Sequence, residues 1–254
     1  MSDVIRSLWI GPALSAMEQR CIASFLDHGH PFELFVYDHV AGVPAGVQLR
    51  DAREIVPPSR IFRYREHESV SGFSNLFRYK LLFERGGWWA DTDVVCLQPF
   101  DFGREHVFAS EHFHGERVVT SCVLRAPSGS AVMRDAWETC EARDPASLAW
   151  GETGPKLCAR LVQTFALDAC VEAPEVFCPV PWWEWRSFLD DDWPRRIAPR
   201  TRAVHLWNEM WRRNGAAKDP LPPGLDSIHE CSFYTLRPEK IRNPNRAHNS
   251  GSHK

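Results

Sequence analysis

The first forty residues alternate strand, helix and strand patterns, and this alternation restricts the fold more than any other feature of the sequence. Residues 5–10 form a short apolar run closed by Gly11-Pro12, and a second apolar run covers residues 32–37. Between them, the spacing expected for one face of a helix is shared by Met17, Cys21, Phe25 and Leu26. The pattern predicts parallel strands in an α/β protein, with a ligand site beyond their carboxyl ends.

Similar alternation continues to about residue 170, which favours a single large domain for a chain of 254 residues. Apolar spacing predicts a helix from about residue 73 to Gly86-Gly87, and further helices over residues 131–142 and 156–167. Strands are expected at residues 107–110 and 118–125. We therefore expect one domain over residues 1–239, followed by a polar, disordered tail over residues 240–254.

Composition limits the classes of partner. A formal charge of −3 gives no basic footprint for nucleic acid. The eight cysteines include no C-x-x-C pair and lie mostly among apolar neighbours, so we expect reduced core residues rather than a zinc site or a disulfide framework. There is no basic leader with a long apolar core and no apolar run of about eighteen residues, which favours a cytoplasmic protein.

Two carboxylates interrupt an otherwise apolar stretch. Asp91-Thr92-Asp93 follows Gly86-Gly87-Trp88-Trp89-Ala90 and precedes a run of apolar residues, 94–97. Two unpaired carboxylates at the end of a buried strand would repel each other and lose hydration, at a cost of several kcal/mol. A divalent cation between them is the simplest solution.

Polar and aromatic side chains at the predicted sheet edge are candidates for ligand contacts. Asn75 and Arg78 are three residues apart and share one face of the helix that precedes the carboxylates, where they either point at a ligand or are solvated. Trp9 ends the first predicted strand, where its ring either stacks on a base or packs in the core. Gly11 and Asp38 are expected at the same edge.

Three later segments also have two interpretations each. Residues 151–155, which include Thr153 and Gly154, form either an anion- or sugar-binding turn or an ordinary helix start. His205 is either a metal ligand or a core histidine, with the aromatic Trp207 beside it. Trp182 and Trp183 either form a wall for a sugar acceptor or pack elsewhere.

The order of these motifs resembles glycosyltransferase family 32, a family of DXD-containing sugar transferases. The resemblance covers residues 5–211, and it is carried by residues 8–11, 74–79 with Gly86-Gly87, 91–93, 153–155 and 205–207. The family includes initiating yeast mannosyltransferases, capsular polysaccharide enzymes and α-1,4-galactosyltransferases. The resemblance implies a GT-A fold, a Rossmann-like mixed sheet flanked by helices, and transfer from a nucleotide sugar with retention, using Mn²⁺ or Mg²⁺.

The resemblance also implies roles for individual residues. Trp9 would stack on the base beside Ile10 and Gly11, and Arg78 would contact the donor together with Thr92, Thr153 and Gly154. Asp91 would face the ribose or the sugar, Asp93 would ligate the metal, and His205 would complete the metal shell. Asn75 occupies a position where the family usually has Asp, which leaves the identity of the donor sugar open. Trp182, Trp183 and Trp207 are expected on the acceptor side.

The sequence therefore predicts a metal-dependent glycosyltransferase with Asp91, Asp93 and Arg78 as catalytic residues. A UDP-sugar is the favoured donor, and the acceptor is a saccharide, a lipid-linked group or a protein. Peripheral membrane contact would involve Trp182 to Trp185. One alternative is a phosphohydrolase, because residues 91–95 fit a D-x-D-x-V string, although that string normally closes the first strand of its domain. A non-catalytic carbohydrate-binding module is the other.

Overall fold

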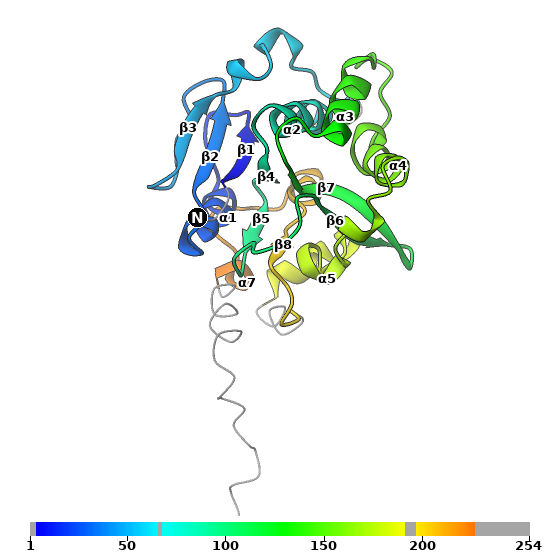
Figure 1. Ribbon diagram of the computed structural model, residues 1–254. Coiled ribbons are helices and arrows are strands. Elements are labelled where there is room, and N and C mark those ends of the chain that lie inside the picture. Colours follow the sequence, from blue (N-terminus) through cyan, green and yellow to red (C-terminus); the bar gives the residue numbers. More distant parts are fainter. Residues whose placement is uncertain (1–3, 66–67, 191–196, 227–254) are drawn as a thin grey trace, which may run out of the picture.

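The computed structural model describes residues 4–65, 68–190 and 197–226. Its centre is a six-stranded sheet with the order β3-β2-β1-β4-β7-β6 (Figure 1). The strands are β1 (Ile5–Trp9), β2 (Phe32–Val36), β3 (Gln48–Asp51), β4 (Gly87–Ala90), β6 (Val107–Phe113) and β7 (Glu116–Ala126). The first four are parallel where they pair, whereas β7 is antiparallel to both β4 and β6. This confirms the predicted mixed α/β fold.

Successive side chains along the sheet enter two separate hydrophobic cores. On β4, Trp88 belongs to one cluster and Trp89 to the other, because neighbouring residues of a strand point to opposite faces. The Trp88 cluster is covered by α1 (Ala16–Asp27). The Trp89 cluster is covered by α2 (Ser71–Arg85), α3 (Ala131–Glu141) and α4 (Leu157–Thr164). Helices thus flank both faces of the sheet.

A small second sheet lies beside the main one. It pairs β5 (Val94–Cys96) with β8 (Ala203–His205) in antiparallel register, with Val94 opposite His205. Because β5 begins directly after the carboxylate motif, this pairing brings a histidine from far along the chain to that motif. Short helices complete the fold: α5 (Pro174–Phe177), α6 (Asn208–Arg213) and α7 (Pro223–Asp226), with 3₁₀ turns at Ala52–Glu54, Pro58–Arg60, Asp168–Cys170 and Trp182–Leu189 and a π-turn at Glu152–Lys156.

Some boundaries differ from the predicted ones. The strand β3 was not predicted, because all four of its residues are exposed and its sequence has no apolar alternation. The strand β6 continues to Phe113, beyond the predicted end at residue 110, because its last three residues pair with residues 116–118 of β7 although two of them are polar. The predicted tail, residues 240–254, and the domain boundary at residue 239 lie outside the described residues.

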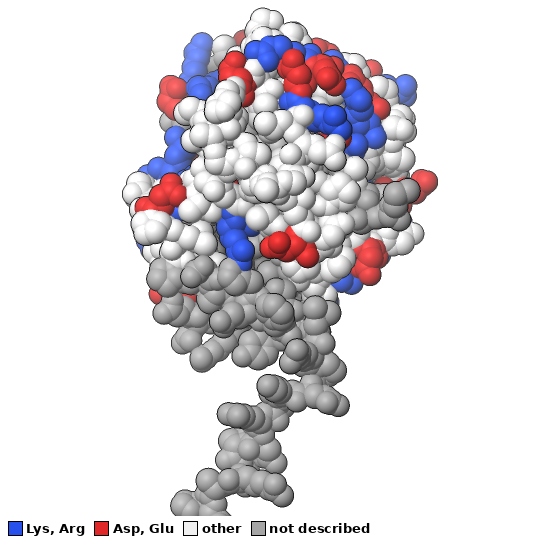
Figure 2. Space-filling view, turned by 90° about the vertical axis from the view of Figure 1, so that its left-hand side faces the viewer, with Lys and Arg blue, Asp and Glu red and all other residues white. Residues whose placement is uncertain are grey.

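The surface of the molecule mixes both signs of charge on the face drawn in Figure 2, where Lys and Arg gather beside Asp and Glu along its upper rim. Much of the area below this rim carries neither sign. Within the described ranges, none of the helices has both the length and the apolar character needed to span a bilayer.

Candidate active site

The two carboxylates occupy the turn between β4 and β5. The backbone N–H of Asp91 donates to the carbonyl of Cys122 (2.8 Å), and that of Val94 donates to the carbonyl of Asp91 (3.1 Å). The first bond continues the pairing of β4 with β7, and the second closes a tight turn around Thr92. The motif therefore leaves the carboxyl end of β4 in a fixed conformation, at the edge of the sheet where a ligand site was expected.

Arg78 holds Asp91 in place from the neighbouring helix. Its Nη2 donates to Oδ1 of Asp91 (2.8 Å), and the indole Nε1 of Trp89 donates to the same oxygen (2.8 Å). Its Nη1 donates to both the carbonyl (2.7 Å) and the hydroxyl (2.6 Å) of Ser121. Arg78 is only 4% exposed, so the alternative of a solvated helix face is wrong. The guanidinium is part of the framework that orients Asp91.

Burial and charge act in opposite directions on Asp91. Removal from water raises its pKa, the guanidinium of Arg78 opposes that rise, and the negative charge of Asp93 adds to it. The net pKa lies above the ordinary value of an aspartate. The negative charge of Asp93 thus disfavours ionisation of Asp91, but neither carboxylate is unpaired, contrary to the expectation from the sequence, because Arg78 pairs with Asp91 and His205 with Asp93. A cation between them would relieve the repulsion that remains.

Asp93 pairs with His205. The imidazole Nε2 lies 3.2 Å from Oδ2 of Asp93, and the backbone N–H of Asn208 donates to the same oxygen (2.7 Å). Burial by itself would raise the pKa of Asp93 and lower that of His205, but their mutual attraction outweighs it. The pKa of Asp93 is therefore lowered, and that of His205 lies well above its usual range.

A metal ion could be held where these groups meet. One ligand atom from each of Asp91, Asp93 and His205 lies within 4.8 Å of the others. Two carboxylates with a single imidazole suit Mn²⁺ or Mg²⁺ better than they suit Zn²⁺ in a closed structural site, which usually has thiolate or several histidine ligands. The residues therefore fit a divalent cation of that class.

The turn at Glu152–Lys156 is held by side-chain hydrogen bonds to α2, the helix that carries Arg78. The side-chain amide of Asn75 donates to the hydroxyl of Thr153 (3.3 Å), and the hydroxyl of Tyr79 donates to the carbonyl of Thr153 (2.9 Å). A Cβ added at Gly154 would lie 3.2 Å from Nδ2 of Asn75. The glycine permits close approach to a polar, buried part of α2, and the anion- or sugar-binding role of the turn stays a prediction.

The predicted aromatic residues are distributed over several places. Trp9 is partly buried against the α1 side of the core, and its indole lies over Gly11, while Ile10 packs against the opposite core. Trp207 packs on His205 with ring centroids 4.0 Å apart, and its Nε1 donates to the carbonyl of Val180 (2.8 Å). Trp183 is 43% exposed. Among the predicted aromatic residues, Trp207 is in ring contact with the carboxylate–histidine group.

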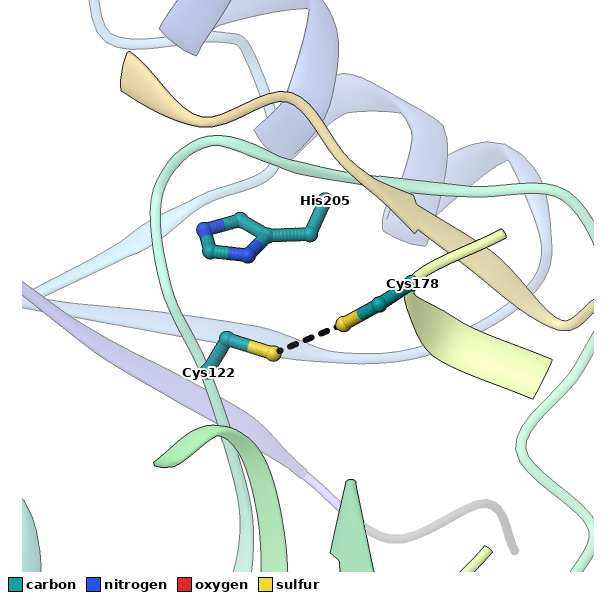
Figure 3. A group of neighbouring side chains, drawn as sticks. All are labelled: Cys122, Cys178 and His205. Carbon is teal, nitrogen blue, oxygen red and sulfur yellow. Dashed lines mark hydrogen bonds between the residues drawn. The ribbon is translucent and has the colours of Figure 1, made fainter. Parts of the chain in front are cut away.

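Several residues near the site were not predicted. Ser121 and Cys122 lie on β7, and Cys178 follows α5, yet the thiols of Cys122 and Cys178 lie close to His205 (Figure 3). Glu111 on β6 is buried and interacts electrostatically with His205. Glu111 could have been noticed in the sequence, because it is a charged residue directly after the predicted strand 107–110. Ser121, Cys122 and Cys178 resemble ordinary strand and core residues.

The motif resemblance is confirmed by comparison with known proteins. Residues 16–113 match the family model described as a glycosyltransferase sugar-binding region containing a DXD motif. This segment, which contains Asp91 and Asp93, is thus similar to the DXD glycosyltransferases.

Its relatives include the lactosylceramide 4-alpha-galactosyltransferases of Pongo pygmaeus and Homo sapiens, each 31% identical over 150 residues. Those matches cover 54% of this chain, and 66% and 41% of the respective relatives. The chain therefore spans less than two thirds of the relatives it matches. The solved structure of the PaToxG glycosyltransferase aligns with 93% of this chain and 86% of its own, with a TM-score of 0.48 and 12% identity.

Proposed function

We propose that this protein is a metal-dependent glycosyltransferase that moves a sugar from a nucleotide sugar to a hydroxyl acceptor. The observation that carries the proposal is the convergence of Asp91, Asp93 and His205 at the carboxyl edge of the sheet, with Arg78 buried behind them. Sequence similarity also supports the proposal, because the matching relatives are named as alpha-galactosyltransferases.

Asp91, Asp93 and His205 would hold Mn²⁺ or Mg²⁺. The bonds described above use Oδ1 of Asp91 and Oδ2 of Asp93, so the second oxygen of each carboxylate is the proposed ligand atom. When bound, the cation would stabilise the negative charge that develops on a diphosphate leaving group, without any need for a proton. His205 would contribute its Nε2, and its present bond to Asp93 would then be replaced by the cation that both residues share.

Arg78 is proposed to act through Asp91 and not by contact with the donor. Both of its terminal nitrogens already donate to protein groups, namely Asp91, Ser121 and Ser74. Asn75, Thr153 and Gly154 are proposed to approach the donor sugar, with Trp9 and Gly11 at the base. We propose retention with front-face attack, in which the departing phosphate takes the acceptor proton; a covalent sugar adduct on a carboxylate would contradict this mechanism.

The donor site is tested by calorimetric titration of UDP and GDP, each with and without Mn²⁺. Wild type should bind one nucleotide, UDP by preference, only with the cation, and Asp93→Ala should lose that binding. Asp101→Ala is the matched control, because this exposed carboxylate pairs with Arg202 and is not one of the proposed ligands. If neither nucleotide binds and wild type instead cleaves 4-nitrophenyl phosphate with Mg²⁺, the phosphohydrolase alternative replaces the transferase.

A further inference from the structure

Two cysteines and a histidine form a second group of side chains behind the carboxylates. Cys122 and Cys178 are 56 residues apart in the sequence, and their sulfurs are 3.6 Å apart. Both are almost fully buried, at 2% and 1% exposure. In Figure 3 the imidazole of His205 lies above the two sulfurs, with one ring nitrogen directed toward them. One ligand atom from each of the three residues lies within 4.8 Å of the others.

The sulfur separation fits a shared tetrahedral cation. Zn²⁺ binds thiolates at about 2.3 Å, so two thiolates on one tetrahedral ion lie roughly 3.8 Å apart. The observed 3.6 Å is close to that value, and it is well above the roughly 2.05 Å of a disulfide bond. The two thiols are thus arranged as two corners of a metal site, although no C-x-x-C spacing is present in the sequence.

His205 is oriented as a metal ligand with a supporting carboxylate. Its Nε2 pairs with Asp93 (3.2 Å), while its buried Nδ1 makes no hydrogen bond of regular geometry, although the ring interacts with the thiol of Cys122. A histidine that ligates a metal through one nitrogen commonly donates its other N–H to a carboxylate, which fixes the ring. The Asp93–His205 pair already has that form, and it leaves Nδ1 for a cation.

Glu111 adds a buried carboxylate to the same region, outside the group of three ligands. It is 8% exposed, and its Oε2 has no hydrogen-bond partner in the described part of the chain. Its charge raises the pKa of Cys178, and the imidazole of His205 lowers the pKa of Glu111, so a cation on the three ligands would also stabilise this carboxylate. A buried carboxylate that lacks a partner is costly unless a cation or a proton compensates it.

We infer that Cys122, Cys178 and His205 form a site for one thiophilic divalent cation such as Zn²⁺. Thiolates select Zn²⁺ over Mn²⁺ or Mg²⁺, whereas the oxygen ligands of Asp91 and Asp93 have the opposite preference. The two groups of ligands are therefore chemically distinct and share only His205. This inference needs no nucleotide and no sugar transfer, so it stands or fails separately from the proposed function.

The site is tested by titrating the full chain, after treatment with a chelator, with Cd²⁺ alone and following thiolate-to-metal charge transfer in the ultraviolet. Wild type should develop the band with one equivalent of cation. Cys122→Ala and Cys178→Ala should each lose most of it. The control variants Cys140→Ala, a buried thiol on α3, and Cys231→Ala should keep it. A wild-type protein without the band, or a band that both site variants retain, would overturn the inference.

A second measurement needs no variant, in case the two site variants do not fold. Zinc X-ray absorption of wild type loaded with one equivalent of Zn²⁺ should show two sulfur ligands at about 2.3 Å together with nitrogen or oxygen ligands. A first coordination sphere of nitrogen and oxygen alone would place the zinc elsewhere and reject the site.

Discussion

Arg78 stabilises the site through protein contacts, with hydrogen bonds to Asp91, Ser121 and Ser74. The Arg78→Met variant would leave Asp91 without its cation and Ser121 without two donors. Removing one partner of a buried ion pair typically costs about 3–5 kcal/mol; because Asp91 is 24% exposed, we expect the free energy of unfolding to fall by somewhat less, about 2–4 kcal/mol. Urea denaturation measures the change.

The matched control for this prediction lies on the same helix. Arg85 pairs with Glu54, but both side chains are about half exposed, so Arg85→Met should change stability by less than about 1 kcal/mol. Adding Asp91→Asn to Arg78→Met should recover part of the loss, because the uncompensated charge is removed. Equal losses for the two arginine variants would show that Arg78 has no special role.

The Asp93–His205 pair should make stability depend on pH in both directions. The pKa of Asp93 is lowered, so its contribution is full above the unfolded pKa of about 3.9 and is lost as the pH falls through the folded value. The pKa of His205 is raised, so its contribution is full below the unfolded pKa of about 6.5 and is lost as the pH rises through the folded value.

The pair therefore stabilises the fold most between about pH 4 and pH 6.5. In the presence of a chelator, wild type should exceed His205→Gln in stability by more at pH 5.5 than at pH 9.5, measured by urea denaturation at each pH. A difference that stays constant from pH 5.5 to pH 9.5, or that grows with pH, would mean that the ion pair does not form.

The turn at Glu152–Lys156 depends on a close approach to α2. In Gly154→Ala the new methyl group would lie 3.2 Å from Nδ2 of Asn75 and 3.6 Å from the hydroxyl of Ser121. Asn75 is buried and bonded to Thr153, so it cannot move away freely. We expect a loss of about 1–2 kcal/mol in urea denaturation. Gly103→Ala, where nothing lies within 4 Å, should be neutral or slightly stabilising.

Sequence reasoning succeeded where the signal is local. The apolar runs and helical spacing of β1, α1 and β2 lie within forty residues, and they predict the parallel start of the sheet. Asp91 and Asp93 are recognised because two charges interrupt an apolar stretch. The edge strand β3 has no such signal, since its side chains are exposed and its stability comes from pairing with β2.

Contacts between residues far apart in the sequence could not be predicted in the same way. Cys122 and Cys178 each look like a core residue, and only the packing of α5 against the strands brings their sulfurs together. The role of Arg78 as a support for Asp91 likewise depends on β7 placing Ser121 beside it. Such contacts depend on how β7 folds back along β4, and no spacing in the sequence encodes that return.

The two faces of one imidazole connect the chemistry on either side of His205. Nε2 meets the carboxylates and Nδ1 meets the thiols, so a proton or a cation at one nitrogen changes the basicity of the other. Thermodynamic reciprocity then applies: the factor by which an ion on the sulfur side changes affinity on the oxygen side must equal the factor in the reverse direction. A single ring would thus let the availability of one metal report on, and regulate, the binding of another.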